Sequence, residues 1–279
     1  MIRRPPRSTQ SRSSAASDVY KRQRMGSRIV ALSKEYPELK LVGAIEAKKN
    51  PKLKLDAGSV AGVGDLGVKI TDNLEKIINK TDTVVNFTSP EATLEHLKIV
   101  KKFKKSMVIG TTGFSNEQLK IIQKAAKDIP IVLSPNMSVG VNLLFKILKD
   151  IAKVLGDDYD VEIVEAHHRM KKDAPSGTAI KMAKIIAESL GRNFDEVAVY
   201  ARKGIIGERT KQEIGIQTVR AGDIVGEHNV IFGGLGERVE IIHKASSRDT
   251  FARGALRAVI WLKGKPAGLY DMADVLGIK

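Results

Sequence analysis

Short apolar runs alternate with amphipathic segments through the first half of the chain. The apolar runs predict buried strands at Leu39–Ile45, Thr83–Phe87, Met107–Gly110 and Ile131–Ser134. Apolar residues at helical spacing predict helices over residues 27–37, 91–103 and 116–127. Strands and helices that alternate in this way predict βαβ units and a mostly parallel sheet.

The pattern changes after Pro135. Helices are predicted at about Val139–Leu155 and Ser176–Leu190. Strand-like segments fill the rest of this region, at Tyr159–Ala166, Val197–Ala201, Glu213–Val219, Glu227–Phe232 and Arg238–His243. Glycine-rich turns between them favour a mixed, antiparallel-rich sheet. The predicted fold class is α/β: a parallel-sheet domain over residues 24–135, completed by residues 249–279, and an α+β domain over residues 136–248.

Residues 1–23 lack a periodic apolar pattern. Together with Arg24 they hold seven basic residues against one acid, Asp18. Such composition is typical of a disordered tail or a transit peptide. The segment nevertheless occupies the place where a strand and a loop should precede the helix over 27–37. We therefore interpret residues 1–23 as non-native sequence, similar to translated sequencing-adapter read-through, and expect the first strand to be missing.

The net charge of +15 raises the question of nucleic-acid binding. Part of this charge lies in the tail, and the lysines elsewhere follow predicted helix faces, as solvated charges usually do. One Trp and few other aromatic residues offer little for base stacking, so we expect no specific nucleic-acid partner. The chain has no cysteine and no apolar run long enough to cross a membrane. This favours a cytoplasmic protein that does not contact a membrane and has no thiolate metal site. No metal of any kind is expected.

Residues 165–179, EAHHRMKKDAPSGTA, carry the clearest chemistry. A strand ends in His167 and His168, a short basic loop follows, and Pro-Ser-Gly-Thr opens a helix. Free N–H groups at a helix start attract anions, and Gly177 lets a ligand approach the backbone. Lys171 supplies a cation, and imidazole exchanges protons near neutral pH. Each feature alone is usually packing or capping, but the combination predicts a carboxylate ligand beside a proton-transfer group.

This segment resembles the signature of dihydrodipicolinate reductases, more strictly 4-hydroxy-tetrahydrodipicolinate reductases. Further blocks match the family in the same order: residues 86–91 (NFTSPE), 110–114 (GTTGF), 135–142 (PNMSVGVN), 219–228 (VRAGDIVGEH), 243–248 (HKASSR) and 251–255 (FARGA). The resemblance runs from Arg24 to about Val275. It implies a Rossmann-like dinucleotide-binding domain, a substrate and oligomerisation domain, and NAD(P)H-dependent reduction of a cyclic dicarboxylate on the route to lysine and diaminopimelate.

The resemblance also implies roles for individual residues. His167 and Lys171 match the catalytic proton-transfer residues. Substrate contacts match His168, Ser176, Gly177 and Thr178. Cofactor contacts match Arg24, Met25, Glu46, Gly110, Thr111, Thr112, Ser134, Pro135, Asn136 and Met137. Arg248 fits either a further carboxylate contact or a surface charge. The resemblance also implies a homotetramer.

Glu46 ends the strand that follows the first helix, 20 residues past Gly26. An acid at this place hydrogen-bonds the adenosine ribose 2′-OH and repels a 2′-phosphate. Many relatives have an arginine beside it, where this chain has Ala47. The pattern therefore favours NADH over NADPH, although Lys48 and Lys49 could compensate.

The phosphate loop departs from the family. Of Gly-x-x-Gly-Arg-Met-Gly only Arg24-Met25-Gly26 is present, and residues 21–23 (KRQ) stand where the glycine turn belongs. The amides of that turn meet the pyrophosphate, so weakened cofactor binding is expected.

Three alternatives stay open. The chain could be an inactive truncated product, another two-domain NAD(P)-dependent amino-acid or semialdehyde dehydrogenase, or a non-catalytic dicarboxylate or nucleotide sensor. A different dehydrogenase would share the first domain but not the His-His…Ser-Gly-Thr block. In the favoured hypothesis, closure about Asn136 and Arg248 brings the nicotinamide and the ring within about 3–3.5 Å of each other.

Overall fold

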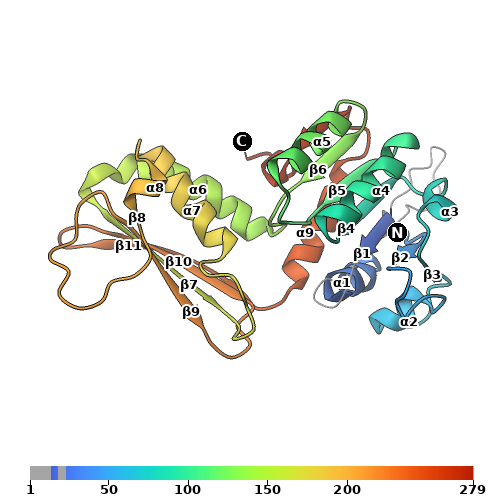
Figure 1. Ribbon diagram of the computed structural model, residues 1–279, viewed down its shortest axis with the longest axis horizontal. Coiled ribbons are helices and arrows are strands. Elements are labelled where there is room, and N and C mark those ends of the chain that lie inside the picture. Colours follow the sequence, from blue (N-terminus) through green and yellow to red (C-terminus); the bar gives the residue numbers. More distant parts are fainter. Residues whose placement is uncertain (1–13, 18–22, 279) are drawn as a thin grey trace. The chain divides into compact units, whose positions relative to one another are not determined.

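The computed structural model describes residues 14–17 and 23–278 (Figure 1). Within them the chain divides into two compact units. Unit 1 holds the chain up to Val139 together with Arg248–Gly277, and unit 2 is built from Gly140–Ser247. The units therefore change within four residues of the boundaries expected from the sequence, after 135 and after 248.

Unit 1 is a sheet whose neighbouring strands all pair in parallel, as predicted. Among the described residues the strand order is β12-β6-β5-β4-β1-β2-β3. The strands are β1 Ser14–Ser17, β2 Ala44–Ile45, β3 Ile70–Thr71, β4 Thr83–Phe87, β5 Ser106–Ile109, β6 Pro130–Leu133 and β12 Gly268–Tyr270. The helices are α1 Gln23–Ser33, α2 Ala57–Ala61, α3 Glu75–Ile78, α4 Pro90–Lys102, α5 Asn116–Ala126, α9 Asp249–Trp261 and α10 Met272–Leu276.

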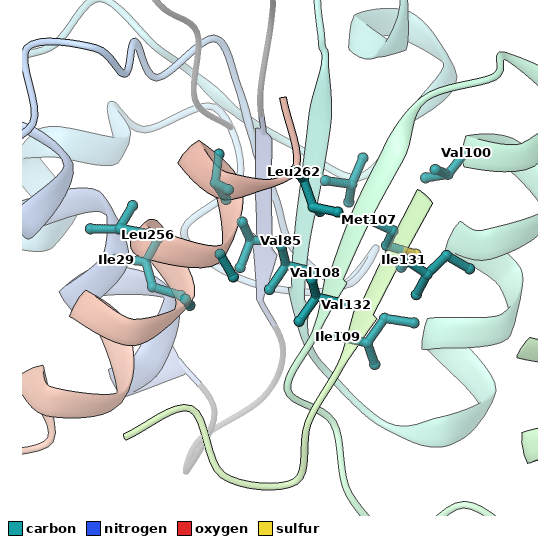
Figure 2. Packing of buried hydrophobic residues seen from close by; sticks show 14 of the residues in the cluster. Ile29, Val85, Val100, Met107, Val108, Ile109, Ile131, Val132, Leu256 and Leu262 are labelled. Carbon is teal, nitrogen blue, oxygen red and sulfur yellow. The ribbon is translucent and has the colours of Figure 1, made fainter. Parts of the chain in front are cut away.

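The core of unit 1 surrounds β4, β5 and β6 (Figure 2). Successive side chains of a strand face opposite sides of the sheet, and both sides are buried here, which explains the continuous apolar runs in the sequence. Val108 is covered on the side of α9, where Leu256 and Leu262 lie, and Met107 on the side of α4, where Val100 lies (Figure 2).

The first strand is present, which corrects the expectation that it would be missing. Ser14–Ser17 form β1 and pair in parallel with β4 on one side and β2 on the other. The segment SAAS has no apolar run, so its sequence carries no strand signal. Its position supplies backbone partners on both sides, and backbone hydrogen bonds form without regard to side-chain type. The rest of the predicted tail, residues 1–13 and 18–22, lies outside the described residues.

Unit 2 is a mixed sheet, as predicted, but it is not antiparallel-rich, since two of its strand pairings are antiparallel and two are parallel. Its strand order is β11-β10-β7-β9-β8. The strands are β7 Asp160–His167, β8 Ala198–Val199, β9 Ile214–Arg220, β10 Gly226–Gly233 and β11 Arg238–Ala245. The helices are α6 Val139–Leu155, a 3-10 turn Gly156–Asp158, α7 Gly177–Ser189 and α8 Phe194–Val197. Strand β10 is antiparallel to β7 and β11, whereas β9 is parallel to β7 and β8.

Alternate residues of the long strands enter the unit 2 core. Val161 and Ile163 of β7, Ile216 of β9, and Val230 and Phe232 of β10 are all at most 1% exposed, and they pack in one cluster with side chains of α6 and α7. No helix in the described part of the chain is both long and apolar enough to cross a membrane.

Candidate active site

The helix-covered face of the unit 2 sheet becomes polar at one end. On β7 the alternation that buries two apolar residues continues with Glu165 and His167. In the strand register, Thr218 and His228 lie beside Glu165, and Arg220 lies beside His167. The sheet therefore brings together residues from three strands that are far apart in the sequence.

Glu165 is the centre of this group, and its side chain is 0% exposed. Its Oε1 accepts hydrogen bonds from the backbone N of Ser176 at 2.9 Å, from Oγ1 of Thr218 at 3.2 Å and from Nη2 of Arg220 at 2.8 Å. Its Oε2 accepts from Nη1 of Arg220 at 2.9 Å and lies 2.6 Å from Nδ1 of His167. All the partners at both oxygens can donate a proton.

The carboxylate of Glu165 is ionised at any pH at which the protein would work. Burial alone raises the pKa of a carboxyl group. The hydrogen bonds from His167, Arg220 and Ser176 outweigh this effect and lower the pKa of Glu165 to about 2. A buried negative charge of this kind is stable only while its donors stay in place.

Three histidines of neighbouring strands form a row next to this carboxylate. The rings of His167 and His228 are 5.3 Å apart in an edge-to-face arrangement, and those of His228 and His243 are 6.5 Å apart. Nε2 of His228 lies 3.0 Å from Oγ of Ser176. Burial lowers the pKa of His228 to about 4, and burial also lowers the pKa of His243. His228 is therefore neutral near neutral pH.

The loop after β7 brings Lys171 toward the same group of residues. The backbone N of Lys171 donates to the carbonyl of His168, and its Nζ donates to Oδ2 of Asp173 at 2.7 Å. The carbonyl of Asp173 accepts from Nη2 of Arg220 at 2.7 Å. Arg220 thus links the lysine loop to Glu165.

Helix α7 begins where its sequence predicted. Ser176 is the N-cap, and its Oγ accepts from the backbone N of Ala179 at 3.2 Å. Gly177 is exposed, and a Cβ built on it would meet no atom within 4 Å; Thr178 is half-buried. The start of this 13-residue helix therefore has open space beside it, and its N–H groups and dipole favour an anion. Glu165 therefore joins the expected catalytic residue His167 directly to the expected substrate residue Ser176.

In unit 1, the expected cofactor residues other than Arg24 and Met25, which lie in α1, follow the carboxyl ends of β2, β5 and β6, where ligands of open α/β sheets bind. Thr111, after β5, is buried in a polar network whose centre is Asn86 of β4. Oδ1 of Asn86 accepts from the hydroxyls of Thr88 at 2.6 Å and Thr111 at 3.1 Å. The side chain of Thr111 therefore fixes the loop, and Thr112 beside it is exposed.

Gly110 is required by its packing. A Cβ at this position would lie 2.2 Å from the ring of Phe87. Ser134, at the end of β6, is buried and donates to the carbonyl of Asn136 at 2.7 Å, while Pro135 is exposed. Met137 is 1% exposed and belongs to the core. A cofactor contact by Met137 would therefore use its backbone.

Glu46 lies at the carboxyl end of β2 and is 8% exposed. Its Oε2 accepts from Nδ2 of Asn50 at 3.0 Å. Glu46 lines a small pocket together with Gly26 and Ser27 from the start of α1. In this arrangement the carboxylate of Glu46 could accept a hydrogen bond from a ribose hydroxyl bound beside the start of α1. Met25 is partly buried against the core, and the side chain of Arg24 lies outside the described residues.

The sequence did not assign Glu165, Thr218, Arg220 or His228 to the site. Glu165 had a usable signal, because residues two apart on a strand share a face and it lies two before His167. The other three reach the site through strand register. Thr218 and Arg220, for example, lie 53 and 55 residues after Glu165 in the sequence. Among the described residues no group of three or more His, Asp or Glu side chains is arranged to hold a metal ion.

Comparison with known proteins covers most of both units. Two family models match, "Dihydrodipicolinate reductase, N-terminus" over residues 22–137 and "Dihydrodipicolinate reductase, C-terminus" over residues 140–276. The chain is 55% identical to the 4-hydroxy-tetrahydrodipicolinate reductase of Syntrophus aciditrophicus strain SB, over 92% of this chain and 96% of the relative. It is also 55% identical, with the same coverage, to the enzyme of that name from Geobacter sulfurreducens.

A solved structure agrees with this result. The dipicolinate-bound dihydrodipicolinate reductase from Paenisporosarcina sp. TG-14 superposes with a TM-score of 0.71 and 25% identity, covering 95% of this chain and 98% of that one. Because both family models match in order and the relatives exceed half identity, the chain belongs to the dihydrodipicolinate reductase family.

Proposed function

We propose that the chain reduces 4-hydroxy-tetrahydrodipicolinate to tetrahydrodipicolinate with NAD(P)H, in the biosynthesis of lysine and diaminopimelate. The ring hydroxyl is replaced by a hydride, so the reaction consumes one hydride and one proton and releases water. The observation that carries the proposal is that one buried carboxylate, Glu165, joins His167 to the start of α7. The helix start fits a carboxylate of the substrate, and His167 beside it fits a proton-transfer residue.

In unit 2, the substrate carboxylates are proposed to bind at the N–H groups of Gly177 and Thr178, where the helix dipole favours negative charge. Lys171 adds a cation, which is proposed to exchange its contact with Asp173, a side chain that is 63% exposed, for a contact with the ligand. His167 is proposed to exchange the proton that the reaction consumes. His168 is proposed as a further carboxylate contact.

In unit 1, the nicotinamide cofactor supplies the hydride when it is bound. Gly110–Thr112 and Ser134–Met137 are proposed to contact the nicotinamide half, since both segments follow the carboxyl ends of central strands. Glu46, held by Asn50, is proposed to accept from the ribose 2′-OH, which favours NADH. Exchange of Glu46 for Ser should raise the NADPH/NADH ratio of kcat/KM by about 10-fold or more, since it removes a charge that repels a 2′-phosphate. An unchanged ratio would show that Glu46 does not select the cofactor.

We also propose a homotetramer. The sheet face opposite α6 and α7 carries the exposed apolar side chains Val219 and Ile242, at 43% and 52% exposure, which association with other copies would cover. Light scattering after size exclusion should give about four times the chain mass of 30.5 kDa. Location in the cytoplasm stays a prediction from composition.

The activity is tested by following nicotinamide oxidation with the cyclic substrate, and with a panel of amino acids and semialdehydes as controls. Turnover of the cyclic substrate alone supports the proposal, and turnover of a panel member instead supports a different dehydrogenase. His167→Ala and Lys171→Ala should each lower kcat by about 10²–10⁴-fold, the usual share of a proton-transfer residue. Unchanged turnover in both variants would remove these residues from the chemistry.

A further inference from the structure

The buried carboxylate of Glu165 joins the two parts of the proposed site, and the mechanism above gives it no role. Its two oxygens are used differently. Oε1 accepts from the backbone N of Ser176, from Thr218 and from Arg220. Oε2 accepts from Arg220 and contacts Nδ1 of His167. One carboxylate therefore fixes both the imidazole and the residue that begins α7.

This contact determines which nitrogen of His167 carries a hydrogen. An ionised carboxylate only accepts hydrogen bonds, so at 2.6 Å the proton belongs to Nδ1 of His167. Nε2 is then the nitrogen that is left to take up or release a proton. Gly226 keeps a side chain away from that atom, since a Cβ there would lie 3.1 Å from Nε2.

We propose that Glu165 is a positioning residue, which holds His167 as the Nδ1–H tautomer with Nε2 as the exchanging nitrogen and, through Ser176, sets the start of α7 relative to that imidazole. The proposal rests on the proposed function for its consequences in catalysis. Its structural content, the tautomer, does not depend on turnover.

The variant Glu165→Gln should reverse the tautomer of His167. The amide has one oxygen and one NH2 group, and hydrogen-bond donors surround both positions, so the NH2 group must face donors wherever it lies. The Oε1 position faces three donor groups and the Oε2 position faces two. The NH2 group therefore takes the Oε2 position, donates to Nδ1 of His167 and forces the Nε2–H tautomer.

Glu162 provides a matched control on the same strand. It points to the opposite face of β7 and also binds arginine, with Arg202 at 2.8 and 2.9 Å and Arg209 at 3.2 Å. Its side chain is 25% exposed, and none of its hydrogen bonds among the described residues goes to a histidine. Glu162→Gln thus removes a carboxylate–arginine pair from the same strand without touching the imidazole.

The first measurement is the imidazole 15N spectrum of the full chain without ligands, at a pH where the histidines are neutral. His167→Asn serves only to assign the His167 signals. The wild type and Glu162→Gln should show a protonated Nδ1 and an unprotonated Nε2 for His167, and Glu165→Gln should show the reverse. An Nε2–H tautomer in the wild type, or no change in Glu165→Gln, overturns the proposal.

The second measurement is the pH dependence of kcat with the cyclic substrate. Loss of a neighbouring carboxylate disfavours protonated imidazole, so Glu165→Gln should lower kcat by about 10²–10⁴-fold and move the alkaline limb of the profile to lower pH. Glu162→Gln should keep the wild-type profile. If both variants lower kcat equally without moving the limb, the role of Glu165 is structural and the proposal fails. If the wild type has the expected tautomer but does not turn the substrate over, the proposed function fails and the tautomer assignment stands.

Discussion

His228 should make unit 2 sensitive to mild acid. Its imidazole is 4% exposed, and burial lowers its pKa from an ordinary 6.5 to about 4. A buried imidazole with a lowered pKa stays neutral in the folded chain, while the unfolded chain binds a proton as the pH falls below 6.5. Stability is therefore unaffected above the unfolded pKa and is lost as the pH falls from 6.5 toward 4.

The size of this loss follows from the two pKa values. Between pH 7.5 and pH 5.5 the difference in proton binding removes about 1.4 kcal/mol from the free energy of unfolding, and by pH 4.5 about 2.5 kcal/mol. Glu165 adds to the loss only below its ordinary pKa of 4.5, because its folded pKa is about 2. The interval from pH 6.5 to 4.5 therefore reports mainly on buried histidine.

The perturbation is His228→Gln, whose amide can still reach Oγ of Ser176 but does not titrate. Urea unfolding followed by far-UV circular dichroism at pH 7.5, 5.5 and 4.5 gives the free energy of unfolding of each chain. Trp261, the single tryptophan, lies in α9 of unit 1, so its fluorescence monitors that unit separately. The pH 7.5 measurement isolates the cost of the substitution itself. If His228→Gln loses as much stability between pH 7.5 and 4.5 as the wild type, the assignment to His228 is wrong.

Two glycines in unit 1 give further predictions from close packing. Gly254→Ala places a Cβ 1.7 Å from the carbonyl oxygen of Met137, so it should destabilise unit 1 by about 1–3 kcal/mol or more, measured as a lower urea midpoint by Trp261 fluorescence. Gly110→Ala places a Cβ 2.2 Å from the ring of Phe87, which must move the loop after β5. Because this loop is proposed to contact the nicotinamide, Gly110→Ala should raise KM for NADH. A variant with the wild-type KM and the wild-type urea midpoint would contradict the packing argument.

The sequence predicted the long elements of unit 1 because their environment is simple. Strands β4, β5 and β6 are buried on both faces, so each is a continuous apolar run. Only the last two residues of the predicted strand Leu39–Ile45 form β2; Leu39 and Leu41 are buried without belonging to a strand. The short elements α2, β3 and β12 were not predicted, because two to five residues are too few to show a period.

The sequence located part of the candidate site, and the reason is related. The His-His loop and the Ser-Gly-Thr helix start lie within one stretch of sequence, so local pattern locates them. Thr218 and Arg220 of β9 bind Glu165, and His228 of β10 lies beside it, so these neighbours depend on strand register. A shift of one residue would turn Thr218 and Arg220 to the other face, and a sequence pattern does not fix register that closely. Cross-strand partners of this kind are visible only in the folded chain.

Thr218 separates the stability of the buried network from its proposed effect on His167. Its hydroxyl donates to Oε1 of Glu165 at 3.2 Å, and it does not touch Oε2, the oxygen that contacts His167. Thr218→Val is similar in shape and removes one donor to a charged acceptor, which should lower the free energy of unfolding by about 1.5–3 kcal/mol. With one donor fewer the pKa of Glu165 should rise, so acid unfolding should begin at a higher pH. The tautomer of His167 and the pH profile of kcat should stay as in the wild type, because the Oε2 side is intact. A profile that moves in Thr218→Val as it does in Glu165→Gln would mean that kcat follows the integrity of the whole network rather than the single contact between carboxylate and imidazole.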